Sequence, residues 1–261
     1  MTEASLRLAL DGDLATVTLS RPEVHNALDE TLIGNIAQAF QKLSVAEAVR
    51  VVVLAAEGAT FCAGADIAGL RRTASQSAEE HRRDAMQIAV MLDAIDRCAK
   101  PVVAMVQGAA LGGGVGLVAA ADIVIASEAA SFGVTEVRLG LGPDVIGPYV
   151  LAAMGARACR RYFLTGERFD AREACRLGLV HAVVAPDRMA EAQARMVEAL
   201  RKGAPKAQAE AKEFVRVVRD MPSGPDMMRW TVGRLAEQRV GGEAPEGLAA
   251  FLEKRMPAWS A

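Results

Sequence analysis

Two glycine-containing stretches carry the residues best suited to chemistry. The first is residues 63–66, Ala-Gly-Ala-Asp, and the second is residues 109–116, Ala-Ala-Leu-Gly-Gly-Gly-Val-Gly. Each follows an apolar segment typical of a buried strand, and the second leads into an apolar segment typical of a buried helix. Because glycine has no side chain, backbone N–H groups in such turns can face a ligand directly. Two such turns aimed at one point would form an oxyanion hole, in which one donor is typically worth on the order of 10²–10³ in rate.

Two other interpretations of these glycines remain open at this point. They could serve only to allow tight turns between strand and helix. In addition, residues 114–119 match the G-x-G-x-x-A fingerprint of dinucleotide-binding proteins, and Glu136 lies twenty residues after Gly116. That fingerprint begins at the end of a strand, whereas residues 107–111 separate the apolar segment 102–106 from the glycines. We therefore favour the oxyanion hole over a dinucleotide site.

The elements around these turns alternate between strands and helices. Residues 6–10 and 14–19 predict a hairpin around an Asp-Gly-Asp turn. Asp29 is predicted to cap a helix whose apolar positions follow the helical period. Continuous apolar runs predict buried strands at residues 51–55, 102–106 and 122–126.

The second half of the chain has a different pattern. The polar segment 71–84 predicts a loop that leads into a helix ending near Cys98. From residue 145 onward helices dominate, with one short strand at residues 181–184; the predicted helices are 145–163, 170–177, 187–202, 204–219, 224–240 and 246–255. The sequence therefore predicts an α/β fold with a helical appendage, which we divide into residues 1–200 and 201–261.

Composition excludes several classes of function. The chain has 261 residues, of which 52% are hydrophobic and 24% charged, and its net charge of −2 gives no indication of nucleic-acid binding. We find neither a signal-peptide pattern nor an apolar run of the roughly eighteen residues that a membrane helix needs. The four cysteines and three histidines show no metal-binding spacing. We expect a cytoplasmic enzyme without a metal site.

An ordered set of motifs resembles the enoyl-CoA hydratase/isomerase (crotonase) superfamily over nearly the whole chain. These motifs are residues 26–28, 61–66, 107–114, 132–140, 164–166, 178–180 and 246–255. The resemblance implies an α/β, crotonase-like spiral of ββα repeats with a helical C-terminal trimerisation region. It implies a homotrimer or homohexamer, an acyl-CoA thioester as substrate, and no cofactor, since coenzyme A is part of the substrate.

The resemblance also implies roles for individual residues. The N–H groups of Ala65 and Gly113 would polarise the thioester carbonyl, and Glu136 would transfer protons. Contacts to coenzyme A are implied for Val24, Asn26, Ala27, Ala63, Asp66 and Ile67, and for Phe251 and Lys254 of a neighbouring subunit.

One position departs from the pattern of typical hydratases. Those enzymes hold one water molecule with two glutamates, of which the first would fall at Gly116 and the second at Glu136. Asp144 is a candidate for the missing acid, because two carboxyl groups in one pocket can act as proton donor and acceptor. The alternative is that Asp144 caps the helix predicted to start near residue 145.

The resemblance favours a hydratase that adds water across the 2,3 double bond of an enoyl-CoA. Residues 139–149, 162–165 and 251–259 resemble bacterial hydratases of branched or carboxylated substrates such as methylglutaconyl-CoA. Two alternatives stay open because one glutamate is missing. One is a Δ3-Δ2-enoyl-CoA isomerase that uses Glu136 alone, and the other is a non-catalytic protein that binds coenzyme A.

Overall fold

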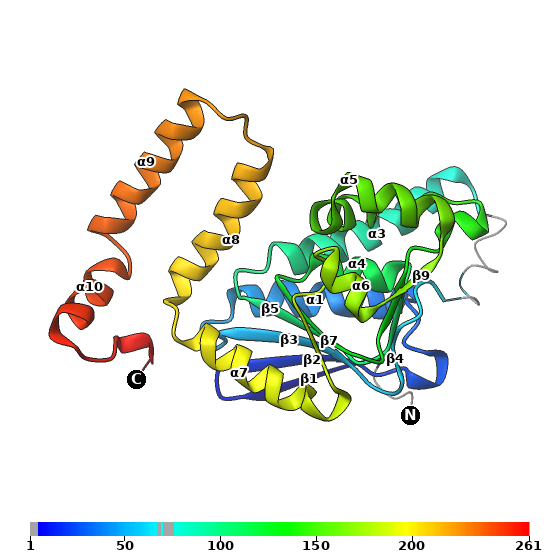
Figure 1. The fold of residues 1–261 in the computed structure, drawn as a ribbon, viewed down its shortest axis with the longest axis horizontal. Helices are drawn as coiled ribbons and strands as arrows, with labels where there is room; N and C mark the ends of the chain where they lie inside the picture. Colours follow the sequence, from blue (N-terminus) through cyan, green and yellow to red (C-terminus); the bar gives the residue numbers. More distant parts are fainter. Residues whose placement is uncertain (1–4, 67–68, 70–75, 261) are drawn as a thin grey trace.

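The computed structural model describes residues 5–66, 69 and 76–260 of the chain. In Figure 1 these residues form a layered α/β body, from which the last helices project at one end. The N-terminal end of the chain lies on the body, whereas the C-terminus lies beside the projecting helices.

A six-stranded sheet forms the main layer of the body. Its strand order is β1 (Leu6–Asp11), β2 (Leu14–Leu19), β3 (Val51–Ala56), β5 (Val102–Val106), β7 (Ile123–Ser127) and β10 (Ala182–Val184). β1 and β2 form an antiparallel hairpin, and the remaining neighbours pair in parallel. The predicted hairpin and the three predicted buried strands are therefore confirmed.

Helices α1 (Glu30–Val45) and α3 (Ala78–Asp96) cover one face of this sheet, and α7 (Met189–Arg201) covers the other. Asp29 caps α1 as predicted, since its Oδ1 accepts the N–H of Leu32 at 2.8 Å. The loop predicted over residues 71–84 is wrong in its second half, because Ser77 and Glu80 form a capping box that starts α3 at Ala78. Residues 70–75 lie outside the described part of the chain.

A second, smaller sheet contains β4 (Thr60–Cys62), β6 (Ala109–Leu111), β8 (Ser131–Gly133) and β9 (Arg168–Asp170), in that order. β4, β6 and β8 are mutually parallel, and β9 joins them antiparallel. Strands of three residues are too short to show an alternating pattern, so these four strands were not predicted from the sequence. Because β4, β6 and β8 are parallel, their carboxyl ends lie at one edge of the sheet.

The connections after these strands are helical. α4 (Gly113–Ala120) follows β6, and the short 3-10 helix η2 (Glu136–Leu139) follows β8. α5 (Gly147–Thr165) starts two residues later than predicted and is broken at Gly155, whose φ of 75° and ψ of 160° are not helical. α6 (Ala171–Arg176) then leads to β10.

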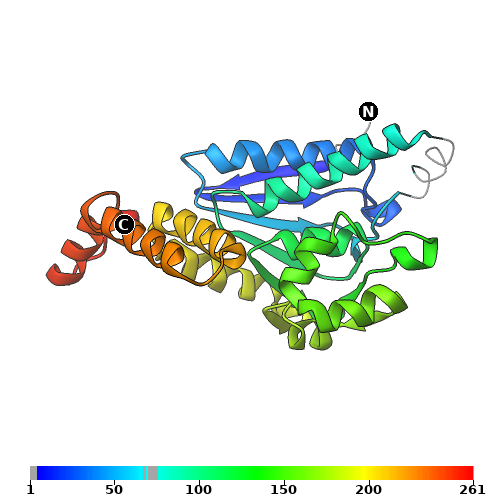
Figure 2. The ribbon, with the colours of Figure 1, turned by 90° about the horizontal axis from the view of Figure 1, so that it is seen from above.

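Helices α8 (Pro205–Asp220), α9 (Pro225–Val240) and α10 (Ala244–Glu253) project from the body (Figures 1 and 2). Two cationic side chains attach them to it. Arg50, next to β3, donates to the carbonyl oxygens of Trp259 at 2.8 Å and Gly203 at 2.6 Å. Lys212 of α8 lies 2.7 Å from the carboxylate of Asp122 beside β7. No helix in the described ranges is long and apolar enough to cross a membrane.

Asn26 connects the loop before α1 to the loop between β3 and β4. Its side chain is fully buried, its Nδ2 donates to the carbonyl oxygens of Glu57 and Thr60 at 2.8 Å each, and its Oδ1 accepts the N–H of Arg21 at 2.8 Å. Its φ of 53° lies in the left-handed region, which asparagine adopts more readily than most residues. These bonds fix the backbone beside the first glycine turn.

We predict that Asn26→Ala lowers the free energy of unfolding by at least about 2 kcal/mol, because three partly buried backbone groups lose a fully buried partner. Urea unfolding followed by circular dichroism measures the effect. Asn35→Ala is the matched control, since Asn35 is only partly buried and makes one side-chain hydrogen bond, to Ser5. Equal unfolding midpoints for the two variants would contradict the role assigned to Asn26.

Candidate active site

Three predicted site residues lie at the common carboxyl edge of the small sheet. Ala65 follows β4, Gly113 follows β6, and Glu136 follows β8. In open α/β sheets ligands bind at the carboxyl ends of neighbouring parallel strands. The structure therefore brings together the two candidate N–H donors and the candidate acid, which lie between residues 65 and 136 of the sequence.

Glycines allow the two turns to pack against each other through their backbones. A Cβ atom on Gly64 would lie 2.7 Å from the carbonyl oxygen of Leu111, and the φ of Gly64 is 86°. A Cβ atom on Gly114 would lie 2.5 Å from the carbonyl oxygen of Cys62. Real Cβ atoms do not approach this closely, so neither position accepts a side chain without a shift of the backbone. The two turns are therefore held in direct contact.

The N–H groups of Ala65 and Gly113 are available to a ligand. Ala65 forms a parallel bridge with Leu28, in which Leu28 N–H donates to Gly64 at 2.7 Å and Asp66 N–H donates to Leu28 at 3.1 Å. The N–H of Ala65 therefore points to the opposite side of that bridge. Gly113 is the first residue of α4, so its N–H has no acceptor within the helix. In the described part of the chain neither N–H group donates a hydrogen bond.

Glu136 places a buried carboxyl group beside the second turn. Its Oε1 lies 3.1 Å from where a Cβ atom on Gly112 would be. Its Oε2 is buried and has no hydrogen-bond partner among the described residues. Burial raises the pKa of Glu136, and hydrogen bonds from its own backbone and that of Thr135 offset part of the increase. A carboxyl group with a raised pKa and an unpaired oxygen suits proton transfer.

Apolar side chains close the position at Gly116, where typical hydratases have the first of their two glutamates. A Cβ atom on Gly116 would lie 2.6 Å from Cγ2 of Ile146 and 3.5 Å from Cδ1 of Leu92. Ile146 and Leu92 are both buried. Sequence reasoning did not identify Ile146. The available signal was a glycine in the middle of an apolar helix, where glycine is unfavourable unless a neighbour packs closely.

Asp144 is exposed and does not cap a helix. The alternative interpretation of Asp144 as an N-cap is wrong, because α5 begins at Gly147 and its N-cap is Ile146, which makes no side-chain capping bond. Asp144 instead lines a cleft of about 430 Å³ between α3, α5 and α8, together with Asp93, Tyr149 and Arg216. Glu136 is not among the residues that line this cleft.

The residues predicted to contact coenzyme A on the N-terminal side lie against the first turn. The N–H of Ala63 donates to the carbonyl oxygen of His25 at 3.0 Å, which seats the segment from Val24 to Ala27 beside the turn. Asn26 and Ala27 are buried, whereas Val24 is exposed. Ile67 lies outside the described residues.

Arg21 connects the N-terminal segment to the first glycine turn through ion pairs. Its guanidinium lies 2.9 Å from the carboxylate of Asp29 and 3.2 Å from that of Asp66, and it donates to the carbonyl oxygen of Ala27 at 2.7 Å. The side chains of Arg21, Asp29 and Asp66 are all largely shielded from solvent. Asp66 therefore helps to hold the first turn against the N-terminal segment, a role that the sequence analysis did not foresee.

Phe251 and Lys254 lie far from this edge within one chain. Both belong to the end of α10, which Figures 1 and 2 show well separated from α4. Phe251 is 80% exposed, and Lys254 adopts a left-handed φ of 54° at the end of the helix. A single chain thus leaves both residues away from the two N–H donors.

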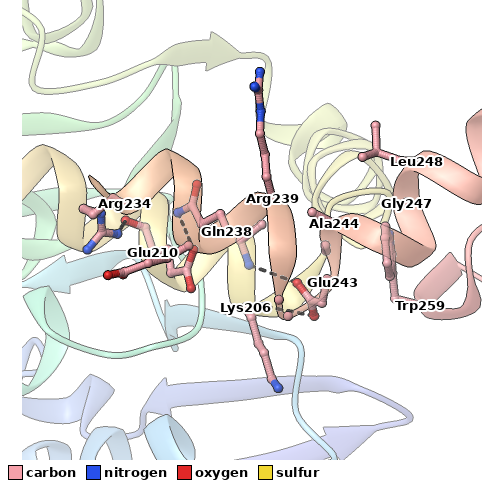
Figure 3. Close-up of a pocket in the computed structure, with 15 residues that line it drawn as sticks. Lys206, Glu210, Arg234, Gln238, Arg239, Glu243, Ala244, Gly247, Leu248 and Trp259 are labelled. Carbon is pink, nitrogen blue, oxygen red and sulfur yellow. Dashed lines mark hydrogen bonds between the residues drawn. The ribbon is translucent and has the colours of Figure 1, made fainter. Parts of the chain in front are cut away.

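A separate cavity of about 530 Å³ lies between α8, α9 and α10 (Figure 3). Glu243 lines it and accepts the N–H groups of Lys206 at 3.1 Å and Ala207 at 3.0 Å, which caps the start of α8. None of the predicted site residues lines this cavity. Across the described residues, no three histidine, cysteine, aspartate or glutamate side chains gather in a way that could hold a metal ion.

Comparison with known proteins identifies the family of this chain. The sequence model described as "Enoyl-CoA hydratase/isomerase" matches residues 10–261. The crystal structure of an enoyl-CoA hydratase from Shewanella pealeana has a TM-score of 0.95 and 40% identity to this chain, covering 98% of it and 96% of that chain. Carnitinyl-CoA dehydratase of Salmonella arizonae is 34% identical over 98% of both chains. (E)-Benzylidenesuccinyl-CoA hydratase of Thauera aromatica is 31% identical over 97% of both.

These matches extend over almost the whole length of the chain, and they share the α/β body together with the projecting helices. The resemblance identified from the ordered motifs and the crotonase-like fold expected from it are both confirmed. The chain belongs to the enoyl-CoA hydratase/isomerase, or crotonase, family of enzymes.

Proposed function

We propose that this protein is an enoyl-CoA hydratase that adds water across the 2,3 double bond of an enoyl-CoA thioester. One observation carries the proposal: Glu136 has a buried carboxyl oxygen beside the second glycine turn, which packs on the first, and among the described residues this oxygen has no partner and the N–H groups of Ala65 and Gly113 have no acceptor. Relatives named as a hydratase and a dehydratase support hydration over isomerisation.

The proposed mechanism uses each of these three groups. The thioester carbonyl oxygen accepts hydrogen bonds from Ala65 and Gly113, which stabilise the negative charge that develops when the substrate becomes an enolate. The carboxylate of Glu136 accepts a proton from water while the water oxygen bonds to C3. The same carboxyl group then gives a proton to C2, which returns it to the ionised form. The sum is the addition of one water molecule, with no cofactor besides the coenzyme A of the substrate.

We extend the proposal to the substrate and its binding surface. The segment from Val24 to Ala27, together with Ala63, Asp66 and Ile67, would border the path of coenzyme A. The similarity of residues 139–149 and 251–259 to bacterial methylglutaconyl-CoA hydratases supports a branched or carboxylated acyl group. Asp144 remains a candidate second acid only if the acyl group or a water molecule reaches the cleft that it lines.

One structural observation favours a second candidate function. Because Ile146 occupies the space beside Gly116, the site offers one carboxyl group where typical hydratases have two. A single carboxyl group can move a proton between C4 and C2, which is the reaction of a Δ3-Δ2-enoyl-CoA isomerase. A protein that only binds coenzyme A is less well supported, because it would have no need for a buried carboxyl group with a raised pKa.

Glu136→Gln should lower kcat by at least about 10²-fold, because the amide can neither accept nor return the proton. The wild type and the variant are both assayed with crotonyl-CoA and with a 3-enoyl-CoA. The assays use water enriched in ¹⁸O, so that the wild-type products also distinguish the two candidate reactions. Label at C3 identifies a hydratase, and a shifted double bond without label identifies an isomerase. Glu128→Gln, at an exposed glutamate paired with Arg172, is the control and should retain full activity. Turnover close to that of the wild type in Glu136→Gln would rule out the assigned role.

The raised pKa of Glu136 has a second measurable consequence. Between the ordinary pKa of glutamate and the raised value, the folded state holds a proton that the unfolded state has released, so the free energy of unfolding decreases as pH rises. Glu136→Gln removes this cost. Its melting temperature should exceed that of the wild type by an amount that grows as pH rises above the ordinary pKa of glutamate and becomes constant above the raised pKa. The kcat/KM of the wild type should decrease on acidification through the same raised pKa. A melting difference independent of pH would contradict this account.

We also propose that the protein assembles as a homotrimer or homohexamer through its projecting helices. These helices expose a series of large apolar side chains: Phe214, Val215, Met228, Val232, Leu235, Leu248, Phe251 and Leu252. Exposed apolar surface of this extent indicates a protein interface. In such an assembly Phe251 and Lys254 would reach the coenzyme A bound to a neighbouring subunit.

Leu252→Glu should dissociate this assembly, because it would bury an unpaired charge in the interface. Light scattering after size-exclusion chromatography gives the mass. Val45→Glu is the matched control, since Val45 at the end of α1 is 79% exposed and Leu252 is 77% exposed. A wild-type protein that is monomeric at micromolar concentration, or equal masses for the two variants, would contradict the proposal.

A further inference from the structure

Ile146 and Leu92 form an apolar plug against one face of α4. Ile146 comes from the N-cap of α5 and Leu92 from α3, and both contact the position where Gly116 lacks a side chain. Ile146 is 4% exposed and Leu92 is fully buried. Since a Cβ atom on Gly116 would be only 2.6 Å from Cγ2 of Ile146, the isoleucine methyl occupies the space that any side chain at 116 would need.

The plug lies one helical turn beyond the proposed reacting groups. The N–H of Gly116 donates to the carbonyl oxygen of Gly112 at 3.2 Å, so the two residues are separated by one turn, a rise of about 6 Å. The carboxyl group of Glu136 lies against Gly112, and the donor N–H belongs to Gly113. An acyl group that starts at Gly113 and extends past Glu136 along α4 therefore reaches Ile146 after a short distance.

A cleft lies near the segments that carry the plug. The cleft of about 430 Å³ is lined by residues adjacent to the plug in sequence, namely Asp144 and Val145 before Ile146, and Ala89, one turn before Leu92. Pro148 and Tyr149 of α5 complete this side of the cleft. Neither Ile146 nor Leu92 lines this cleft, but both are close in sequence to residues that do, and the cleft has enough volume for several further carbon atoms.

We propose that Ile146, supported by Leu92, determines acyl-chain length and restricts the enzyme to short-chain enoyl-CoA substrates. This inference rests on the proposed function. Removal of the Ile146 side chain frees the space beside Gly116 in the direction of Asp144 and Val145, which line the cleft, so that a longer acyl chain can extend toward it. In the wild type a long chain meets the side chain of Ile146, which is 4% exposed and packed against Gly116.

The test compares kcat/KM for crotonyl-CoA and 2-octenoyl-CoA in the wild type, Ile146→Val and Ile146→Ala. The wild type should prefer crotonyl-CoA. Ile146→Ala should raise the ratio of octenoyl to crotonyl activity by at least about tenfold, the scale on which a hydrophobic pocket discriminates between chain lengths. Ile146→Val removes one methyl group and should shift the ratio in the same direction by less, which keeps the test valid if the alanine variant folds poorly.

Val150→Ala is the matched control, because Val150 is fully buried on the same helix and none of its atoms is among the three nearest to a Cβ atom on Gly116. Its substrate ratio should equal that of the wild type. A wild-type preference for octenoyl-CoA, or folded Ile146 variants with an unchanged ratio, would overturn the inference.

Binding separates failure of this inference from failure of the proposed function. Butyryl-CoA and octanoyl-CoA cannot be hydrated, but calorimetry measures their Kd values in the same three proteins. If no enoyl-CoA is turned over but Ile146→Ala still gains affinity for octanoyl-CoA relative to butyryl-CoA, the proposed function is wrong and Ile146 still limits chain length. If turnover occurs but neither ratio changes, only the inference fails.

Discussion

The backbone contact between the two glycine turns is the constraint on which the site depends. Gly64 lies against the carbonyl of Leu111, and Gly114 lies against the carbonyl of Cys62. Because these contacts join backbone to backbone, the separation of the Ala65 and Gly113 N–H groups is set by strand pairing in the small sheet and not by flexible side chains. Donors fixed in this way need no reorganisation when charge develops on a substrate oxygen.

The carboxyl group of Glu136 completes this arrangement at a cost in stability. Its buried oxygen has no partner in the described part of the chain, and a buried acceptor without a partner is unfavourable. The surrounding fold is able to hold it because Gly112, directly below the carboxylate, leaves room for it. On the same helix, Gly116 gives its space to Ile146, an apolar side chain. Gly112 thus leaves room for the carboxyl group of Glu136, whereas Gly116 leaves room for the apolar side chain of Ile146.

Local patterns predicted those parts of the fold that local interactions determine. The hairpin, the three buried strands and the Asp29 cap follow from periodicity and capping chemistry, and the structure contains them. The small sheet was not predicted, since β4, β6 and β8 have three residues each and are defined by their partners. The break at Gly155 was also missed, because an isolated glycine does not reveal whether a helix ends there.

In the candidate site, too, some residues could be predicted from the sequence and others depend on tertiary contacts. Ala65, Gly113 and Glu136 could be proposed from glycine turns and from the family resemblance, and the structure places them at one sheet edge. Neither Ile146 nor Arg21 could be found in this way. The contact between Ile146 and Gly116 forms only when α5 packs on α4, and the two ion pairs of Arg21 join segments up to 45 residues apart.

The guanidinium of Arg50 makes the projecting helices part of one folding unit with the body. Its acceptors are the carbonyl groups of Arg201 and Gly203 before the projecting helices and of Trp259 after them, and its Nε is buried without a partner among the described residues. A chain ending near residue 200 would lose all three acceptors and leave this cation without its hydrogen bonds. The boundary between the body and the projecting helices is therefore a change of architecture. We expect the two parts to unfold together in one cooperative transition.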